Sequence, residues 1–309
     1  MSTHIVESNG QTVRSGYLDP AAPAAAAVAS GDRVRYPRTW THWGNEAVYG
    51  MSFADREPLR HRYPHGPYSM VGPVEVAGAR PGDVIECAQP YVHYFRFDDE
   101  RRVARYTHGI SLPMAPFLGV LAVEPGGDDQ VSAILAGPYG GNLVLRDLRV
   151  GSSLFLPVAK PGGRVWIGDV HALQGDGVVD QTAIETAAEN LEIRYDLHSG
   201  VALRAPLVET PDSWIVIGFA DGLDDALTAC LRELIHWLAA AIELTEPEAY
   251  ALASMAVSFR VTQYAHQTAS AYSSVPPKAV HAVIPKAIFP PALRDQVTRW
   301  LRPGTGGGL

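Results

Sequence analysis

Residues 165–177 read VWIGDVHALQGDG, and the rest of the chain is organised around this stretch. Its apolar start predicts a buried strand that runs into a polar site. If the strand continues, the i, i+2 spacing of Asp169 and His171 projects both side chains from the same face. The two glycines that flank Asp176 permit a turn that brings its carboxylate back toward that face.

A further acid, Glu185, follows this stretch closely. Carboxylates and an imidazole that converge could bind a divalent metal, or place a general base beside a polarising group. The same residues are also common as turn formers and as hydrogen-bonded polar side chains. Spacing alone leaves both interpretations open.

Composition bounds the class of protein. The chain has 309 residues, of which 47% are hydrophobic and 19% charged, so it can form one large or two ordinary globular domains with a substantial core. The net charge of −8 and the absence of a long basic run argue against nucleic acid and anionic membrane partners. No window approaches a transmembrane helix.

The two cysteines, Cys87 and Cys230, are far apart and lie in apolar contexts. They form no CxxC pair and no disulfide framework, which fits a reducing compartment. We therefore expect both to be buried structural residues and the protein to be cytoplasmic.

The pattern of short elements predicts an α+β, β-rich fold. Strand-like runs alternate with Pro-Gly turns at residues 81–82, 125–126 and 161–162, within a chain of 24 prolines and 29 glycines. We expect short-strand sheets with a barrel-like core. Two helices are predicted at about residues 224–260, from leucines at helical spacing and from the capping box that Thr245 opens.

The N-terminal part differs in texture. We expect residues 1–70 to form an aromatic and charged segment that packs on a β-rich domain, residues 71–309, which carries the helical hairpin 224–260 in one structural unit. Residues 51–70 are dense in charge and rings and predict an irregular, solvated or lid-like segment. His42, between two tryptophans, predicts a strand end beside a pocket, with a packed aromatic pair as the alternative.

Two other positions are candidates on composition alone. Asn142 follows paired glycines that could let a backbone approach a ligand, although a plain turn explains them equally well. His108 could be a ligand or a structural histidine. The chain has no phosphate-binding loop and no G-x-S-x-G nucleophile elbow.

Several motifs, in order, resemble the acetamidase/formamidase family. GDVHALQGDG at 168–177 is similar to that family's GDxHxxQGDGE, and GPVEVAGARPGD at 72–83 is similar to its GPV-x-V-x-GA-x-PGD turn. GGN at 140–142, GSSLFLPV at 151–158 and HAVIPK at 281–286 also fit. The resemblance covers roughly residues 70 to 290.

The resemblance implies hydrolysis of a small linear carboxamide, such as formamide or acetamide, with release of ammonia. It also implies a divalent metal, for which zinc is our expectation, and a homodimer. We expect the metal to be held by Asp169 and His171, completed by Glu185, His42 or His108. The expected catalytic residues are Asp176, Glu185, Asn142 and Gln174.

Two positions depart from the family pattern: Val144 stands where GGN-x-D has aspartate, and Val178 stands where GDGE has glutamate. The loss of two carboxylates could weaken a metal site, remove a general base or reshape the pocket. Two alternatives therefore stay open. One is hydrolysis of a larger or cyclic amide, such as a lactam, and the other is a non-catalytic binder of an amide-like metabolite.

Overall fold

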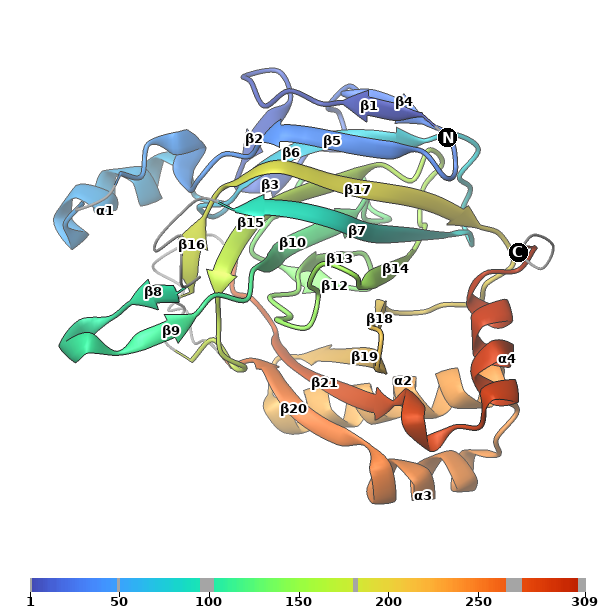
Figure 1. Ribbon diagram of the computed structural model, residues 1–309. Helices are drawn as coiled ribbons and strands as arrows, with labels where there is room; N and C mark the ends of the chain where they lie inside the picture. The colour runs from blue at the N-terminus through green and yellow to red at the C-terminus, as the bar shows by residue number, and fades with distance from the viewer. Residues whose placement is uncertain (1, 49–50, 95–102, 180–182, 265–273, 305–309) are drawn as a thin grey trace.

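The structure is a computed structural model that describes residues 2–48, 51–94, 103–179, 183–264 and 274–304. Two large sheets dominate it (Figure 1). The first has nine strands, in the order β1 (Thr3–Ile5), β5 (Arg33–Arg38), β17 (Ala188–His198), β7 (Val84–Tyr94), β14 (Ser153–Pro157), β18 (Leu207–Glu209), β19 (Ser213–Ala220), β21 (Lys278–Pro285) and β20 (Ser258–Gln263).

The second sheet has eight strands and carries the candidate site. Its order is β12 (Ala136–Gly137), β13 (Gly140–Asn142), β10 (Phe117–Val123), β15 (Val165–Leu173), β6 (Ser69–Val76) and β2 (Val13–Ser15), with β16 (Ile184–Thr186) beside β15 and β4 (Ala26–Val28) beside β6. Two small sheets pair β3 (Tyr17–Leu18) with β11 (Val131–Ser132), and β8 (Val103–Arg105) with β9 (Ser111–Pro113).

The main core lies between the two large sheets. Side chains of β5 and β17 in the first sheet and of β6, β10 and β15 in the second form one buried cluster, which includes Tyr36, Ile193, Leu121 and Ile167. Strands β10 and β15 are buried along almost their whole length, whereas β17 alternates between buried and partly exposed residues. The central strands of the second sheet are therefore covered on both faces.

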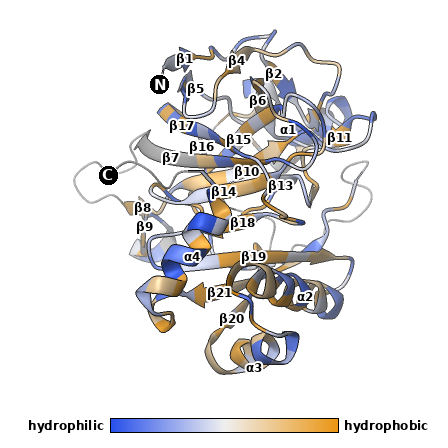
Figure 2. Ribbon diagram, turned by 90° about the vertical axis from the view of Figure 1, so that its right-hand side faces the viewer, coloured by the Kyte–Doolittle hydropathy of each residue, from blue (hydrophilic) through white to orange (hydrophobic). Residues whose placement is uncertain are grey.

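Four α-helices occur among the described residues: α1 (Phe53–Arg62), α2 (Leu223–Ile242), α3 (Glu246–Ala256) and α4 (Pro291–Leu301). Short 3-10 helices occur at η1 (Trp43–Asn45), η2 (Thr107–Gly109) and η3 (Lys286–Ile288). A second core forms where α2, α3 and α4 pack near β19 and β21 (Figures 1 and 2). Within the described residues, no helix has the length and apolar character needed to cross a bilayer.

A buried ion-pair network anchors α4 to the first sheet. Arg302, at the end of α4, donates to both carboxylate oxygens of Glu86 at 2.6 and 3.0 Å, and His198 lies 2.9 Å from the same carboxylate. Glu86 is 1% exposed. Desolvation raises its pKa, but His198 and Arg302 outweigh this and lower the pKa to about 2.

The predicted fold class is confirmed, and the predicted helical segment is divided between α2 and α3. Thr245 accepts from the backbone N–H of Glu248, as the capping box predicts. The buried face of α2 is centred on Cys230 and Leu234. Leu227, one of the leucines at helical spacing, is instead exposed, because the face that enters the core with β19 and β21 is the one that holds Cys230 and Leu234.

The prediction of an irregular segment at residues 51–70 is wrong for its first half. Residues 53–62 form α1, which projects from one side of the sheets (Figure 1). Ser52 caps it by accepting from the backbone N–H of Asp55, whose carboxylate accepts from the Ser52 N–H. This reciprocal cap offsets the high polarity of the segment.

The boundary at residue 70 stays a prediction. Tyr36 and Val34 of the N-terminal segment belong to the same buried cluster as Leu121 and Ile167.

Both cysteines, Cys87 and Cys230, are buried and form no disulfide, as expected.

Candidate metal and catalytic site

Strand β15 carries two ionisable side chains into the interior. Asp169 is 4% exposed and His171 is 2% exposed, on a strand that pairs with β10 on one side and with β6 and β16 on the other. Buried ionisable groups need polar partners, because their desolvation is otherwise costly. The partners identify the site.

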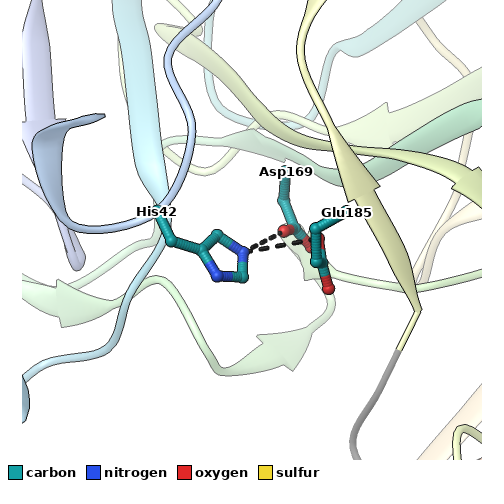
Figure 3. Close-up of side chains that lie close together, drawn as sticks. All are labelled: His42, Asp169 and Glu185. Carbon is teal, nitrogen blue, oxygen red and sulfur yellow. Dashed lines mark hydrogen bonds and ion pairs between the residues drawn. The ribbon is translucent and has the colours of Figure 1, made fainter. Parts of the chain in front are cut away.

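Four side chains from three parts of the chain converge here. His42 precedes η1, and its Nε2 lies 3.1 Å from Asp169 Oδ1 and 3.4 Å from Glu185 Oε2 (Figure 3). His171 Nε2 lies 2.9 Å from Asp169 Oδ2 and 3.1 Å from Glu185 Oε2. Glu185 reaches this position because it faces His171 in the register of β16 against β15. The two imidazoles and two carboxylates form what we call the His–Asp quartet.

The backbone at Asp169 is not that of an ordinary strand. Its φ is +55°, in the left-handed region that aspartate tolerates better than most residues. Across the sheet, Gly119 of β10 has no side chain; a Cβ there would lie 2.5 Å from Asp169 Oδ2 and 2.8 Å from its backbone oxygen. The turned backbone and the missing side chain together make room for the Asp169 carboxylate.

Charges within the quartet balance. Desolvation lowers the pKa of His42, but the hydrogen bonds and charges of Asp169 and Glu185 raise it to about 10. The same carboxylates raise the pKa of His171 well above its usual range against desolvation. Desolvation raises the pKa of Glu185, but His171 and His42 lower it well below 4.5. The carboxylates therefore favour the protonated form of each imidazole, and the imidazoles favour the ionised form of Glu185.

The quartet has the donor set of a divalent metal site. Asp169 Oδ2 and His171 Nε2 face each other at 2.9 Å, yet neither has a hydrogen bond of acceptable direction among the described residues. His42, Asp169 and Glu185 each offer a ligand atom within 4.8 Å of the others. Imidazole nitrogens and carboxylate oxygens suit zinc. A divalent cation in place of the two imidazole protons keeps the charge balance, so these residues fit such an ion.

Gln174 fixes the orientation of the His171 ring. Its Nε2 donates to the backbone oxygen of Val144 at 2.7 Å, which turns its Oε1 toward His171 Nδ1 at 2.9 Å. Because Oε1 can only accept, His171 Nδ1 must carry a proton. Nε2 is then the atom directed at Asp169 and Glu185. The ring is also held edge-on to Phe117, with centroids 5.1 Å apart.

The structure does not bring Asp176 or His108 into the quartet. Asp176 instead lies with Asp147 and His281 in a separate group, because the turn after Gln174 runs toward β20. His108 is exposed in η2, with a φ of +55°, and joins neither group. The predicted convergence of Asp169, His171, Glu185 and His42 does occur. The catalytic and ligand roles of all these residues stay predictions.

Asn142 is buried at 2% exposure, but its amide donors are directed elsewhere. Nδ2 donates to the backbone oxygen of Ile134 at 3.2 Å and to the Tyr68 hydroxyl at 3.4 Å. The Tyr68 ring packs edge-on against His42, with centroids 5.3 Å apart. Asn142 therefore contacts the quartet through Tyr68.

Three contributors escaped the sequence-based reasoning: Tyr68, Phe117 and Gly119. None lies in the central stretch, and each reaches the site only through sheet pairing or the packing of β6 and β10 against β15. Tyr68 lies in residues 51–70, for which the density of charges and rings predicts a solvated or lid-like segment, and this is the nearest signal in the sequence. A single sequence holds no pattern that distinguishes Gly119 from other strand glycines.

A surface cavity of about 560 Å³ lies apart from the quartet and is lined by Glu75, Glu124, Lys160 and Arg164 among others. Charged side chains of its lining already bind one another and nearby backbone oxygens. Arg164 donates to both oxygens of Glu124 and to the backbone oxygens of Pro20 and Ala22. We interpret this cavity as structural.

Comparison with known proteins now decides the family. A sequence profile described as the Acetamidase/Formamidase family matches residues 127–290, more than half of the chain. The chain belongs to the acetamidase/formamidase family. The match includes the central stretch, the GGN motif and β20 and β21.

Relatives of known name agree with this family. A Schizosaccharomyces pombe protein assigned as a formamidase is 31% identical over 105 residues, which cover 29% of this chain but only 24% of that protein. The crystal structure of an acetamidase from Bacillus halodurans superposes with a TM-score of 0.80 at 22% identity, covering 93% of this chain and 98% of that one. An acetamidase from Yersinia enterocolitica gives 0.77 at 25% identity, covering 93% and 92%.

The two departures from the family motifs share an unusual backbone. Val144 has a φ of +42° and Val178 a φ of +44°, a region that β-branched residues rarely adopt. Val144 is buried, and its backbone oxygen is the acceptor for Gln174. In this chain, Val144 therefore supplies a backbone acceptor for Gln174 and no side-chain carboxylate.

Proposed function

We propose that this chain hydrolyses a small linear carboxamide to a carboxylate and ammonia, with water activated at a divalent metal, zinc, held by the quartet. Membership of the acetamidase/formamidase family supports amide hydrolysis. The observation that carries the site is the meeting of two imidazoles and two carboxylates. Within it, Asp169 Oδ2 and His171 Nε2 have no hydrogen bond of acceptable direction among the described residues.

A bound divalent ion supplies Lewis-acid chemistry, lowering the pKa of water from 15.7 to about 7. His42, Asp169, His171 and Glu185 would hold it. Gln174 keeps His171 Nδ1 protonated, which leaves Nε2 as the ligand atom. Gly119 leaves the space that the Asp169 carboxylate needs.

Glu185 is the proton carrier in this proposal. Its side chain is 36% exposed, whereas those of Asp169 and His171 are at most 2% exposed, so it is the member that an entering water and amide can reach. It accepts the proton of the attacking water and passes it to the leaving nitrogen, so that the C–N bond breaks and ammonia departs.

The homodimer and the cytoplasmic location remain part of the proposal. Light scattering of the purified protein gives the mass in solution. A mass of one chain would contradict the dimer.

The test pairs metal content with ammonia release. Purified protein is analysed for zinc and assayed for ammonia release from formamide and acetamide, and for the ring-opened amino acid from a five-membered lactam, which releases no ammonia. Each assay is run before and after chelation and after return of zinc. We expect ammonia release from a linear amide, its loss on chelation and its recovery with zinc. Glu185→Gln should lower turnover by a factor of about 10² to 10⁴, whereas exposed Glu7→Gln, which removes the same charge outside the quartet, should not.

Each other outcome has a definite meaning. Unchanged turnover in Glu185→Gln, or full activity after chelation, contradicts the mechanism. Faster opening of the lactam keeps the mechanism and replaces the substrate class. Binding of unchanged amide without ammonia would favour the binder.

A further inference from the structure

A second group of potential ligands lies outside the quartet. Asp147, Asp176 and His281 each offer one ligand atom, and these atoms lie within 4.8 Å of one another. They come from three separate segments: the loop after β13, the turn after β15 and the middle of β21. The quartet uses none of them.

His281 is the informative member, because it is completely buried and half satisfied. Its exposure is 0%, and its Nδ1 lies 2.8 Å from the Thr262 hydroxyl. Its Nε2 has no hydrogen-bond partner among the described residues, and neither has the buried Oδ2 of Asp147. A buried polar atom without a partner costs about 1–3 kcal/mol. Both atoms belong to residues of the same group of potential ligands.

The chemistry of the donors selects the kind of ligand. Desolvation lowers the pKa of His281, and Asp176 and Asp147 act against this. An imidazole nitrogen and two carboxylates form a mixed nitrogen and oxygen donor set. Zinc and similar divalent metals prefer such a set, in which the second ring nitrogen is hydrogen-bonded. Thr262 provides that hydrogen bond.

We propose that Asp147, Asp176 and His281 form a second divalent metal site of the zinc class. The site would join the loop after β13 and the turn after β15 to β21, and so connect the second sheet to the first. Backbone hydrogen bonds already approach the same place, since Gly177 N–H donates to Thr262 at 3.2 Å and Tyr264 N–H donates to Gly177 at 2.7 Å.

The position of this site gives it a positioning role. Asp176 lies two residues after Gln174, and Asp147 lies three residues after Val144. Gln174 and Val144 are the partners of the hydrogen bond that orients the Gln174 amide toward His171. An ion between Asp176 and Asp147 would therefore hold both sides of that hydrogen bond in place. This inference goes beyond the proposed function and does not depend on it.

The experiment counts zinc per chain. Protein is stripped with chelator, equilibrated with Zn²⁺, dialysed and subjected to elemental analysis, with the zinc-dependent rise in Tm as a second readout. We expect about two ions per chain in the wild type and about one each in Asp176→Asn and Glu185→Gln. Asp176 is exposed, so the isosteric change should preserve the fold. Exposed Asp129→Asn is the matched control and should keep the wild-type count.

A wild-type zinc count in Asp176→Asn overturns the second site. Asp147→Asn should repeat the loss, and a full count there has the same meaning. If Glu185→Gln keeps every ion while Asp176→Asn loses one, the second site stands and the proposed metal at the quartet fails. If only Glu185→Gln loses zinc, the second site fails and the quartet stands.

Discussion

Gly119→Ala tests how closely the sheet is fitted around Asp169. The added Cβ would lie 2.5 Å from Asp169 Oδ2, 2.8 Å from its backbone oxygen and 3.0 Å from His171 Cε1. Ordinary contact begins at 3.4 Å, so the backbone oxygen must retreat by about 0.6 Å. That oxygen belongs to β15, whose pairing on both sides resists the movement, and the Asp169 and His171 side chains move with it.

Overpacking of this kind costs about 1–3 kcal/mol of unfolding free energy. For a chain of this size, Tm should fall by a few degrees. A misplacement near 1 Å can lower catalysis by about 10²-fold, so we expect kcat/KM to fall by about ten- to a hundredfold. The loss in activity should exceed what the loss in stability explains, because the protein stays folded at the assay temperature.

The assay combines ammonia release with zinc content and a thermal scan. Gly126→Ala is the matched control, since its Cβ would meet only the Cβ of Ala159, at an ordinary 3.6 Å. Equal behaviour of the two variants would refute the reasoning. So would a Gly119→Ala protein with wild-type activity, zinc content and Tm.

Two further predictions concern buried polar contacts. Gln174→Leu removes the acceptor for His171 Nδ1, and we expect zinc affinity and kcat/KM to fall by about 10–100-fold; unchanged zinc titrations would contradict this role. Because His198 and Arg302 outweigh desolvation and lower the pKa of Glu86 to about 2, its ionised form stabilises the fold above pH 4.5. That contribution, about 3 kcal/mol, should be lost as the pH falls from 4.5 through 2. Glu86→Gln should flatten this acid loss in urea titrations, and a parallel loss in both proteins would contradict the assignment.

Much of the local structure could be read from the residues in order. The apolar start of residues 165–177 predicted β15, and the box opened by Thr245 predicted the start of α3. These features depend on contacts within a few residues, which sequence spacing records directly. The capping box at Ser52 carries the same kind of signal, but the charges around it obscured α1.

The residues of the candidate site also differ in whether local sequence spacing could place them. Asp169 and His171 share a strand and could be paired from their spacing. Asp176 could not be placed, because whether its turn folds back on β15 or runs toward β20 depends on the backbone bonds between Gly177 and Thr262. His108 was a candidate ligand only because it is a histidine. The structure places it in η2, where its side chain is exposed.

The sequence by itself determined the β-rich fold class, the helical segment and the resemblance to amidases, because these rest on periodicity and on motifs read along the chain. Only the tertiary structure decided which groups meet. His42, just before η1, and Glu185 of β16 both reach Asp169, although they lie more than a hundred residues apart in the chain. Gly119 affects the site only because β10 pairs with β15 beside Asp169. Sheet register brings such residues together, and register follows from the packing of the whole core rather than from local sequence.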